Sequence, residues 1–184
     1  MEASHVSPTT GGTTEFRFRE ARFGDQAAIR SIVVSVLAEY ALAPDPQGVD
    51  ADLKDLVSSY DGRGGSFRVV TSREGNIVGC GGLYPITEHI AEIRKMYLLR
   101  EARGHGLGRA LLEELITLAK QRRFERVEVE TASVLREAIS MYRRRGFVPL
   151  ARDHLADRCD QAYVLHLASD VPSSAQCAAA ELRG

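Results

Sequence analysis

The stretch RGHGLGRALLEELI at residues 103–116 places three glycines at alternate positions directly before a leucine-rich segment. Backbone N–H groups at the start of a helix lack partners and carry partial positive charge. Glycine leaves these groups uncovered, so an anion such as a pyrophosphate can approach without meeting a Cβ atom. The stretch therefore predicts an anion-binding loop, or else a tight turn that packs a helix close to a sheet.

Two familiar phosphate-binding motifs do not match this stretch. A P-loop ends in Gly-Lys followed by Ser or Thr, whereas Arg109 follows Gly108 here. A dinucleotide-binding GxGxxG motif counted from Gly104 would need glycine at position 109. The turn does carry local positive charge against the single acid Glu101, and some of these side chains could simply belong to a solvated face. The basic residues around the turn are Arg94, Lys95, Arg100, Arg103 and Arg109.

Composition narrows the class of protein. The 184 residues suit one domain, and 44% of them are hydrophobic, which is enough for a core. The net charge of −1 gives no reason to expect a nucleic acid or an anionic membrane as partner. The cysteines lack CxxC spacing and the histidines lack metal-ligand spacing, so we expect no metal and a cytoplasmic location. No apolar run approaches the ~20 residues of a membrane span.

Hydrophobic periodicity predicts an α/β (α+β) fold with a mixed, mostly antiparallel sheet of six to seven strands and helices on both faces. The glycine pair at 81–82 indicates a bulge or a close neighbour within a strand. We expect residues 1–14 to form a disordered arm, residues 15–168 the domain and residues 169–184 a flexible tail. The expected strands are 15–19, 66–72, 77–84, 90–99, 126–130, 148–150 and 161–167, and the expected helices are 25–40, 50–60, 107–121 and 135–145.

Further residues around the glycine loop resemble one family. Residues 103–108 match the [Q/R]xxGx[G/A] signature of the GCN5-related N-acetyltransferase (GNAT) family. The preceding AEIRKMYLLREA resembles the fourth strand of that family with the turn after it. AISMYRRRGF resembles its helix with a Gly-Phe ending, in which Tyr142 lies four residues before Gly146. The resemblance covers residues 15–167 and implies a GNAT-type sheet with a splayed parallel pair of strands at the cofactor site.

The resemblance implies that the protein binds acetyl-CoA as cosubstrate. In that family the loop amides hold the pyrophosphate, and the free backbone groups of the split strand, here around residues 96–98, pair with the pantetheine amides. A backbone N–H of this strand then acts as an oxyanion site with a single donor. The cofactor contacts implied in this way are Met96, Tyr97, Leu98, Arg103, Gly104, His105, Gly106, Leu107, Gly108, Arg109, Leu135, Ala138 and Tyr142.

Acetyl transfer to an amine requires two proton movements. A lysine-like amine has a pKa of about 10.4 and is mostly protonated at pH 7, so a base is needed, and the departing thiolate benefits from an acid. Relatives with a tyrosine at the position of Tyr142 place its hydroxyl beside the CoA sulfur, which makes Tyr142 the candidate acid. The alternative is an aromatic core residue that shares a helix face with Ile139.

Glu92 is the candidate base. It lies eleven residues before Arg103, the spacing at which histone acetyltransferases of the family carry their base glutamate. Strict strand alternation would place it on one face with Arg94, Met96 and Leu98. The alternatives are an ion pair with Arg94 or an exposed strand-end carboxylate. His89 and Tyr84 could replace Glu92 or hold a water.

The acceptor is the least constrained part of the sequence. Acids gather between the first two expected helices and could attract a cationic amine, but we prefer to interpret them as caps and solvated faces, with Asp50 as an N-cap. They are Glu39, Asp45, Asp50, Asp52, Asp55 and Asp61, against Lys54. His154, Arg158 and Asp160 are candidate acceptor contacts or surface ion pairs, and Cys80 is expected to be a small buried strand residue.

The sequence thus favours an enzyme in which acetyl-CoA and a primary amine form a ternary complex and react directly. The alternative is a non-catalytic acetyl-CoA-binding sensor or structural module of the same fold. A sensor needs neither Glu92 nor Tyr142, so these residues favour the enzyme. The sequence leaves open whether the chain forms a homodimer.

Overall fold

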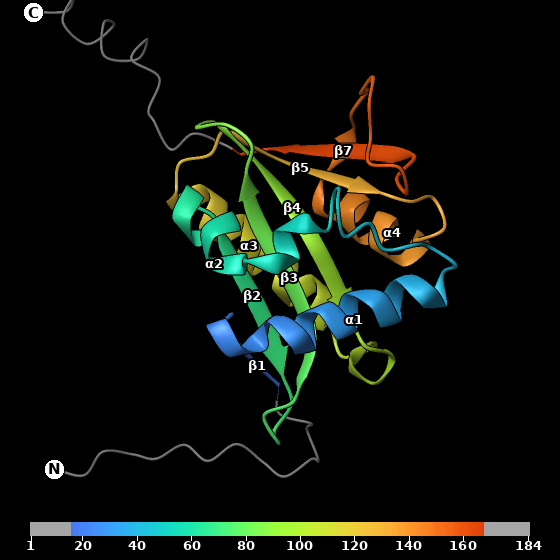
Figure 1. Ribbon diagram of the computed structural model, residues 1–184. Helices are drawn as coiled ribbons and strands as arrows, with labels where there is room; N and C mark the ends of the chain where they lie inside the picture. Colours follow the sequence, from blue (N-terminus) through green and yellow to red (C-terminus); the bar gives the residue numbers. More distant parts are fainter. Residues whose placement is uncertain (1–15, 168–184) are drawn as a thin grey trace, which may run out of the picture.

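The computed structural model describes residues 16–167, which form one mixed seven-stranded sheet with helices on both faces (Figure 1). The strand order is β1-β2-β3-β4-β5-β7-β6, and neighbouring strands are antiparallel except for the pair β4 and β5. This confirms the fold class expected from the sequence. The strands are β1 (Arg17–Glu20), β2 (Ser66–Thr71), β3 (Ile77–Pro85), β4 (Ile90–Leu98), β5 (Arg126–Thr131), β6 (Val148–Pro149) and β7 (Gln161–His166).

The helices cover the two faces of the sheet, and each face has its own apolar core. Helices α1 (Gln26–Glu39) and α2 (Leu56–Ser59) pack on one face. Helices α3 (Leu107–Gln121) and α4 (Arg136–Arg145) pack on the other. Figure 1 shows α1 and α2 in front of the sheet and α3 behind it. Helix α3 has the bounds that the leucine repeat predicts.

The prediction of a single helix at residues 50–60 is wrong. A 3-10 turn at Ala51–Lys54 ends at Asp55, whose backbone is extended with φ −145° and ψ 92°. The Asp55 carboxylate accepts a hydrogen bond from the Ser58 N–H and so starts α2 as a separate helix. Asp50 does not cap a helix with its side chain, because its buried carboxylate lies in an ion-pair cluster.

Strand β4 carries a bulge at Lys95. Its pairing with β3 slips between residues 80 and 82, and Lys95 has a left-handed backbone with φ 55°. At the same level of β3, a Cβ atom on Gly82 would lie 2.3 Å from Cε1 of Tyr60. The glycine pair therefore marks both a bulge and a close neighbour, as its sequence pattern indicates.

The bulge changes which face each residue of β4 occupies. Ile93 packs in the core under α3, so Glu92 and Arg94 point to the α1 face, where Arg94 stacks on a tyrosine. Met96 and Leu98 lie on the α3 side again. The expectation that Glu92 shares a face with Met96 and Leu98 is therefore wrong, because one extra residue shifts the alternation.

The arm expected at residues 1–14 and the tail expected at residues 169–184 lie outside the described residues, so both stay predictions. Among residues 16–167, no helix is long and apolar enough to cross a membrane.

Candidate functional site

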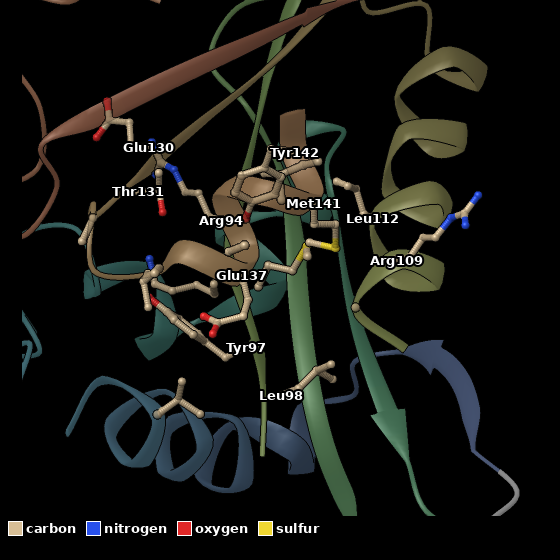
Figure 2. A pocket seen from close by; sticks show the side chains of 18 of the residues that line it. Arg94, Tyr97, Leu98, Arg109, Leu112, Glu130, Thr131, Glu137, Met141 and Tyr142 are labelled. Atoms are coloured by element: carbon tan, nitrogen blue, oxygen red, sulfur yellow. The ribbon is translucent and has the colours of Figure 1, made fainter. Parts of the chain in front are cut away.

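A cavity of about 830 Å³ opens where the parallel strands β4 and β5 separate. These strands pair only between residues 90–92 and residues 126–128. Beyond this point, residues of α3, α4 and the C-terminal part of α1 line the cavity together with both strands (Figure 2). The split leaves an edge of β4 without a partner strand, which is what the family resemblance implies for the cofactor site.

The unpaired edge of β4 presents the backbone of Leu98 to this gap. The Leu99 N–H donates to the Val78 carbonyl of β3 at 2.8 Å, so residue 99 faces β3. Because successive strand residues direct their N–H and C=O groups to opposite edges, residue 98 faces the gap. Its carbonyl accepts a hydrogen bond from Nε of Arg103 at 2.9 Å, which leaves the Leu98 N–H as a donor toward the cavity.

The glycine loop enters α3 with a row of free backbone donors. Within residues 16–167, the N–H groups of residues 104–109 donate no hydrogen bond, and the Ala110 N–H is the first to do so, to the Gly106 carbonyl at 3.0 Å. Gly104 and Gly106 have φ of 80° and 75°, and a Cβ atom on either would meet no atom within 4 Å. The donors at Gly104 and Gly106 are therefore open to an anion, and none of the six N–H groups is occupied by an acceptor of the described residues.

The arginine that begins the loop signature points toward α1. Arg103 donates to both carboxylate oxygens of Glu39, at 2.8 and 3.1 Å, and Arg100 donates to the same carboxylate at 3.3 Å. Glu39 thus balances the charge of Arg103 and fixes the start of the loop against the end of α1. Arg109, in contrast, is exposed on the first turn of α3 and extends away from the helix (Figure 2).

Tyr142 reaches the cavity from α4 (Figure 2). The side chain is only 6% exposed, and its hydroxyl has no hydrogen-bond partner in the described part of the chain. Burial raises the pKa of Tyr142 well above that of a free phenol, and Tyr97 and Cys159 nearby add to the shift. Tyr142 is therefore a neutral phenol at pH 7 that can donate a proton, and it also belongs to the core, as the alternative interpretation holds.

Glu92 lies in the wall of the same cavity and is 5% exposed. Its Oε2 accepts a hydrogen bond from Arg94 at 2.9 Å, and the Arg94 guanidinium lies 3.8 Å from the centre of the Tyr84 ring. The ion pair considered as an alternative is thus present. Oε1 accepts no hydrogen bond from any residue that the structure describes, so one oxygen of Glu92 is available to a ligand.

A buried ion-pair cluster lies beside the bulge, where the sequence suggests a solvated face. The Lys95 ammonium contacts the Val49 carbonyl at 2.7 Å, Asp52 at 3.2 Å and Asp50 at 3.3 Å. Arg158 makes two hydrogen bonds to Asp50, at 2.7 and 2.8 Å. Burial alone would raise the pKa of Asp50, but the hydrogen bonds from Arg158 and a backbone N–H, with the charge of Lys95, hold it below its usual value.

The structure brings most of the expected site residues together, but the cavity lining does not include His105, Tyr84, His89, His154 or Asp160. Glu92 and the other implied cofactor contacts line the same cavity, whereas His105 packs against Phe16 with ring centres 5.4 Å apart. His89 pairs with exposed acids, and Asp160 binds Ser133. Residues of the cavity wall that sequence reasoning missed include Val36, Tyr40, Leu42, Val49, Glu130 and Cys159.

Comparisons with known proteins agree with this geometry. The family model "Acetyltransferase (GNAT) family" matches residues 17–147. The chain is 37% identical over 134 residues to the uncharacterized N-acetyltransferase YjgM of Escherichia coli, covering 70% of this chain and 80% of that protein.

Solved structures share the fold. An acetyltransferase of the GNAT family from Staphylococcus aureus matches with a TM-score of 0.79 at 20% identity, over 84% of this chain and 100% of that one. N-acetylglutamate synthase from Neisseria gonorrhoeae, complexed with coenzyme A and N-acetyl-glutamate, matches with a TM-score of 0.63 at 19% identity, over 85% of this chain and 36% of that one. The family model and the E. coli relative together show that this chain belongs to the GNAT family of acetyltransferases.

Proposed function

We propose that the protein transfers the acetyl group of acetyl-CoA to a primary amine by direct attack in a ternary complex. The observation that carries the proposal is the row of free N–H groups at residues 104–109, which opens onto the split between β4 and β5. A coenzyme A molecule has a diphosphate to accept these hydrogen bonds and a pantetheine arm to pair with the open edge of β4. The positive φ of Gly104 and Gly106 and the open space beside them fit a backbone cradle for that diphosphate.

Residues of this chain would then handle charge and protons. The Leu98 N–H faces the gap and is the candidate donor to the thioester oxygen, where negative charge develops. The carboxylate of Glu92 would take a proton from the acceptor amine, directly or through a water, at its free Oε1. The buried hydroxyl of Tyr142, which is protonated at pH 7, would give its proton to the departing sulfur.

The test is CoA release measured across a panel of primary amines, together with calorimetry of acetyl-CoA binding. Release that depends on an amine supports the enzyme. Tight binding without release for any amine would support the sensor instead, and absence of binding would refute both.

A variant pair isolates the loop. Gly106→Glu should abolish acetyl-CoA binding, because it places a side chain and a negative charge on the donors. Gly75→Glu is the matched control, since Gly75 also has a positive φ of 88° with open space around it but lies in the β2–β3 turn. Wild-type affinity in Gly106→Glu would remove the loop from the proposed site.

A further inference from the structure

The part of the cavity around Glu92 forms a distinct chamber with mixed walls. The Cys159 thiol interacts electrostatically with Glu92, Glu130 and Arg158, so these charged residues all lie near it. The same thiol interacts electrostatically with Tyr142, which places the chamber beside the candidate acid. We call this region the acceptor chamber; it is lined by Glu92, Arg94, Glu130, Arg158, Cys159, Val36, Tyr40, Leu42, Val49 and Tyr97.

The cations of the acceptor chamber are already paired. The Arg158 guanidinium directs two donors to Asp50, at 2.7 and 2.8 Å. Arg94 donates to Glu92 at 2.9 Å and stacks on the ring of Tyr84. A carboxylate on the acceptor could make a two-pronged contact with Arg158 only by displacing Asp50. The Nε of Arg94 has no partner, but it is buried out of reach of a ligand in the chamber.

Apart from Oε1 of Glu92, the anions in and beside the acceptor chamber are paired as well. Glu130 accepts hydrogen bonds from Arg152 and, at 3.0 Å, from the Ala156 N–H. Asp50 is held by Arg158 and Lys95. The remaining carboxylate on the cavity wall nearby, Glu137, is exposed to water, which screens its charge.

The acids of residues 39–61 are not a free acidic patch either. Glu39 holds Arg103 and Arg100, and Asp45 accepts hydrogen bonds from the N–H groups of Gly48 and Val49. Asp52 holds Lys95 and accepts a hydrogen bond from the Tyr60 hydroxyl at 2.7 Å. Within the acceptor chamber, the second ammonium of a polyamine would therefore find no carboxylate that is free of a protein partner once the first is at Glu92.

The rest of the chamber wall is apolar. Val36 and Leu42 come from the end of α1 and the loop after it, and Val49 follows in the same loop. The Tyr97 ring packs in the core on this side of the sheet, as do Leu42 and Tyr40. This surface favours an aliphatic or aromatic body over a charged one.

From these contacts we infer that the acceptor is a primary amine on an apolar body that carries no second charge. The inference rests on the proposed function and names its substrate class. The amine nitrogen lies at Oε1 of Glu92, the one carboxylate oxygen of the chamber facing a ligand without a protein donor, and the apolar body lies against Leu42 and Val49. A second charge, of either sign, loses its water without gaining a partner.

The test uses pentylamine, cadaverine and 5-aminopentanoate, which share an amine on a chain of four methylenes and end in a methyl, a protonated aminomethyl or a carboxylate group. We expect kcat/KM for pentylamine to exceed that for either charged amine by at least tenfold. The comparison is then repeated with analogues of the best acceptor from the amine panel that carry the same three groups at the end far from the reacting amine. Turnover of cadaverine or 5-aminopentanoate at or above the rate of the uncharged amine would overturn the inference and leave the proposed function intact.

A variant pair tests the wall itself. Leu42→Asp adds one carboxylate to the apolar wall and should raise the ratio of cadaverine to pentylamine turnover about tenfold over that of Leu42→Asn, which is polar but uncharged. Equal ratios in the two variants would contradict the placement of the acceptor body against Leu42. If no amine releases CoA although acetyl-CoA binds, the proposed function fails and this inference fails with it.

Discussion

Replacing Lys95 by Met tests the buried cluster that holds the β4 bulge in place. The Lys95 side chain is 1% exposed, and its ammonium contacts the carboxylates of Asp50 and Asp52 at 3.3 and 3.2 Å. Methionine fills a similar volume but has no charge. Asp50 would keep Arg158, whereas Asp52 would keep only the hydroxyl of Tyr60, with its buried Oδ1 already lacking a partner.

The expected loss is large relative to the stability of a domain. Removing one partner of a buried ion pair costs about 3–5 kcal/mol, because the other charge stays buried and uncompensated. A domain has about 5–15 kcal/mol of unfolding free energy in total. With a urea dependence of about 2 kcal/mol per molar, the unfolding midpoint of Lys95→Met should fall by about 2 M.

The assay is urea unfolding followed by circular dichroism. The control is Arg100→Met, since Arg100 is 80% exposed in its ion pair with Glu39 and should show no resolvable change. Adding Asp52→Asn to Lys95→Met removes the orphaned charge and should recover part of the loss, which a double-mutant cycle measures. A midpoint for Lys95→Met within the error of the wild type would refute this account of the cluster.

Three further results are expected. Tyr142→Phe should lower kcat and leave acetyl-CoA affinity nearly unchanged, since only the proton donor is lost; an unchanged kcat would exclude Tyr142 as the acid. Glu92→Gln should lower the rate most at neutral pH, and the deficit should shrink as rising pH deprotonates the amine in solution; a deficit independent of pH would argue for a purely structural role. Stability should fall as pH rises above about 10, because a free tyrosine titrates near 10 whereas burial raises the pKa of Tyr97 to about 12 and that of Tyr142 higher still, so the unfolded chain loses protons first. Unfolding of Tyr142→Phe over the same range should show a shallower fall, and an equal fall would contradict this assignment.

The parts of the fold that local sequence determines were predicted well. The leucine repeat sets the bounds of α3, and the glycines before it set the loop, because helix periodicity and positive φ are properties of a few adjacent residues. Gly146, with φ 101°, ends α4 for the same local reason.

Features that depend on distant partners were not predicted. Lys95 adopts a left-handed backbone that its own residue type disfavours, and its ammonium is held by residues more than forty positions away in the sequence. Asp50 looks like a helix cap in sequence but meets Arg158, 108 positions further along the chain. Lys95 and Asp50 are both charged, and their burial becomes favourable only when the assembled sheet and loops bring their charged partners beside them.

The acceptor chamber was not predicted for the same reason. Its apolar wall comes from the end of α1 and the loop after it, whose sequence shows no motif, and its charged residues come from β4, β5 and the segment before β7. These segments come together only in the folded protein. The glycine loop therefore predicted a cofactor site from the sequence, whereas the wall of the acceptor chamber could not be predicted.

The central claim is that the N–H groups of residues 104–109 hold a diphosphate and thereby lay a thioester along the open edge of β4. A crystal structure of the protein with acetyl-CoA tests it most directly. The account predicts diphosphate oxygens about 2.7–3.2 Å from several of these nitrogens, and the thioester beside Leu98 and Tyr142. A coenzyme bound elsewhere, with residues 104–109 still facing solvent, would contradict it.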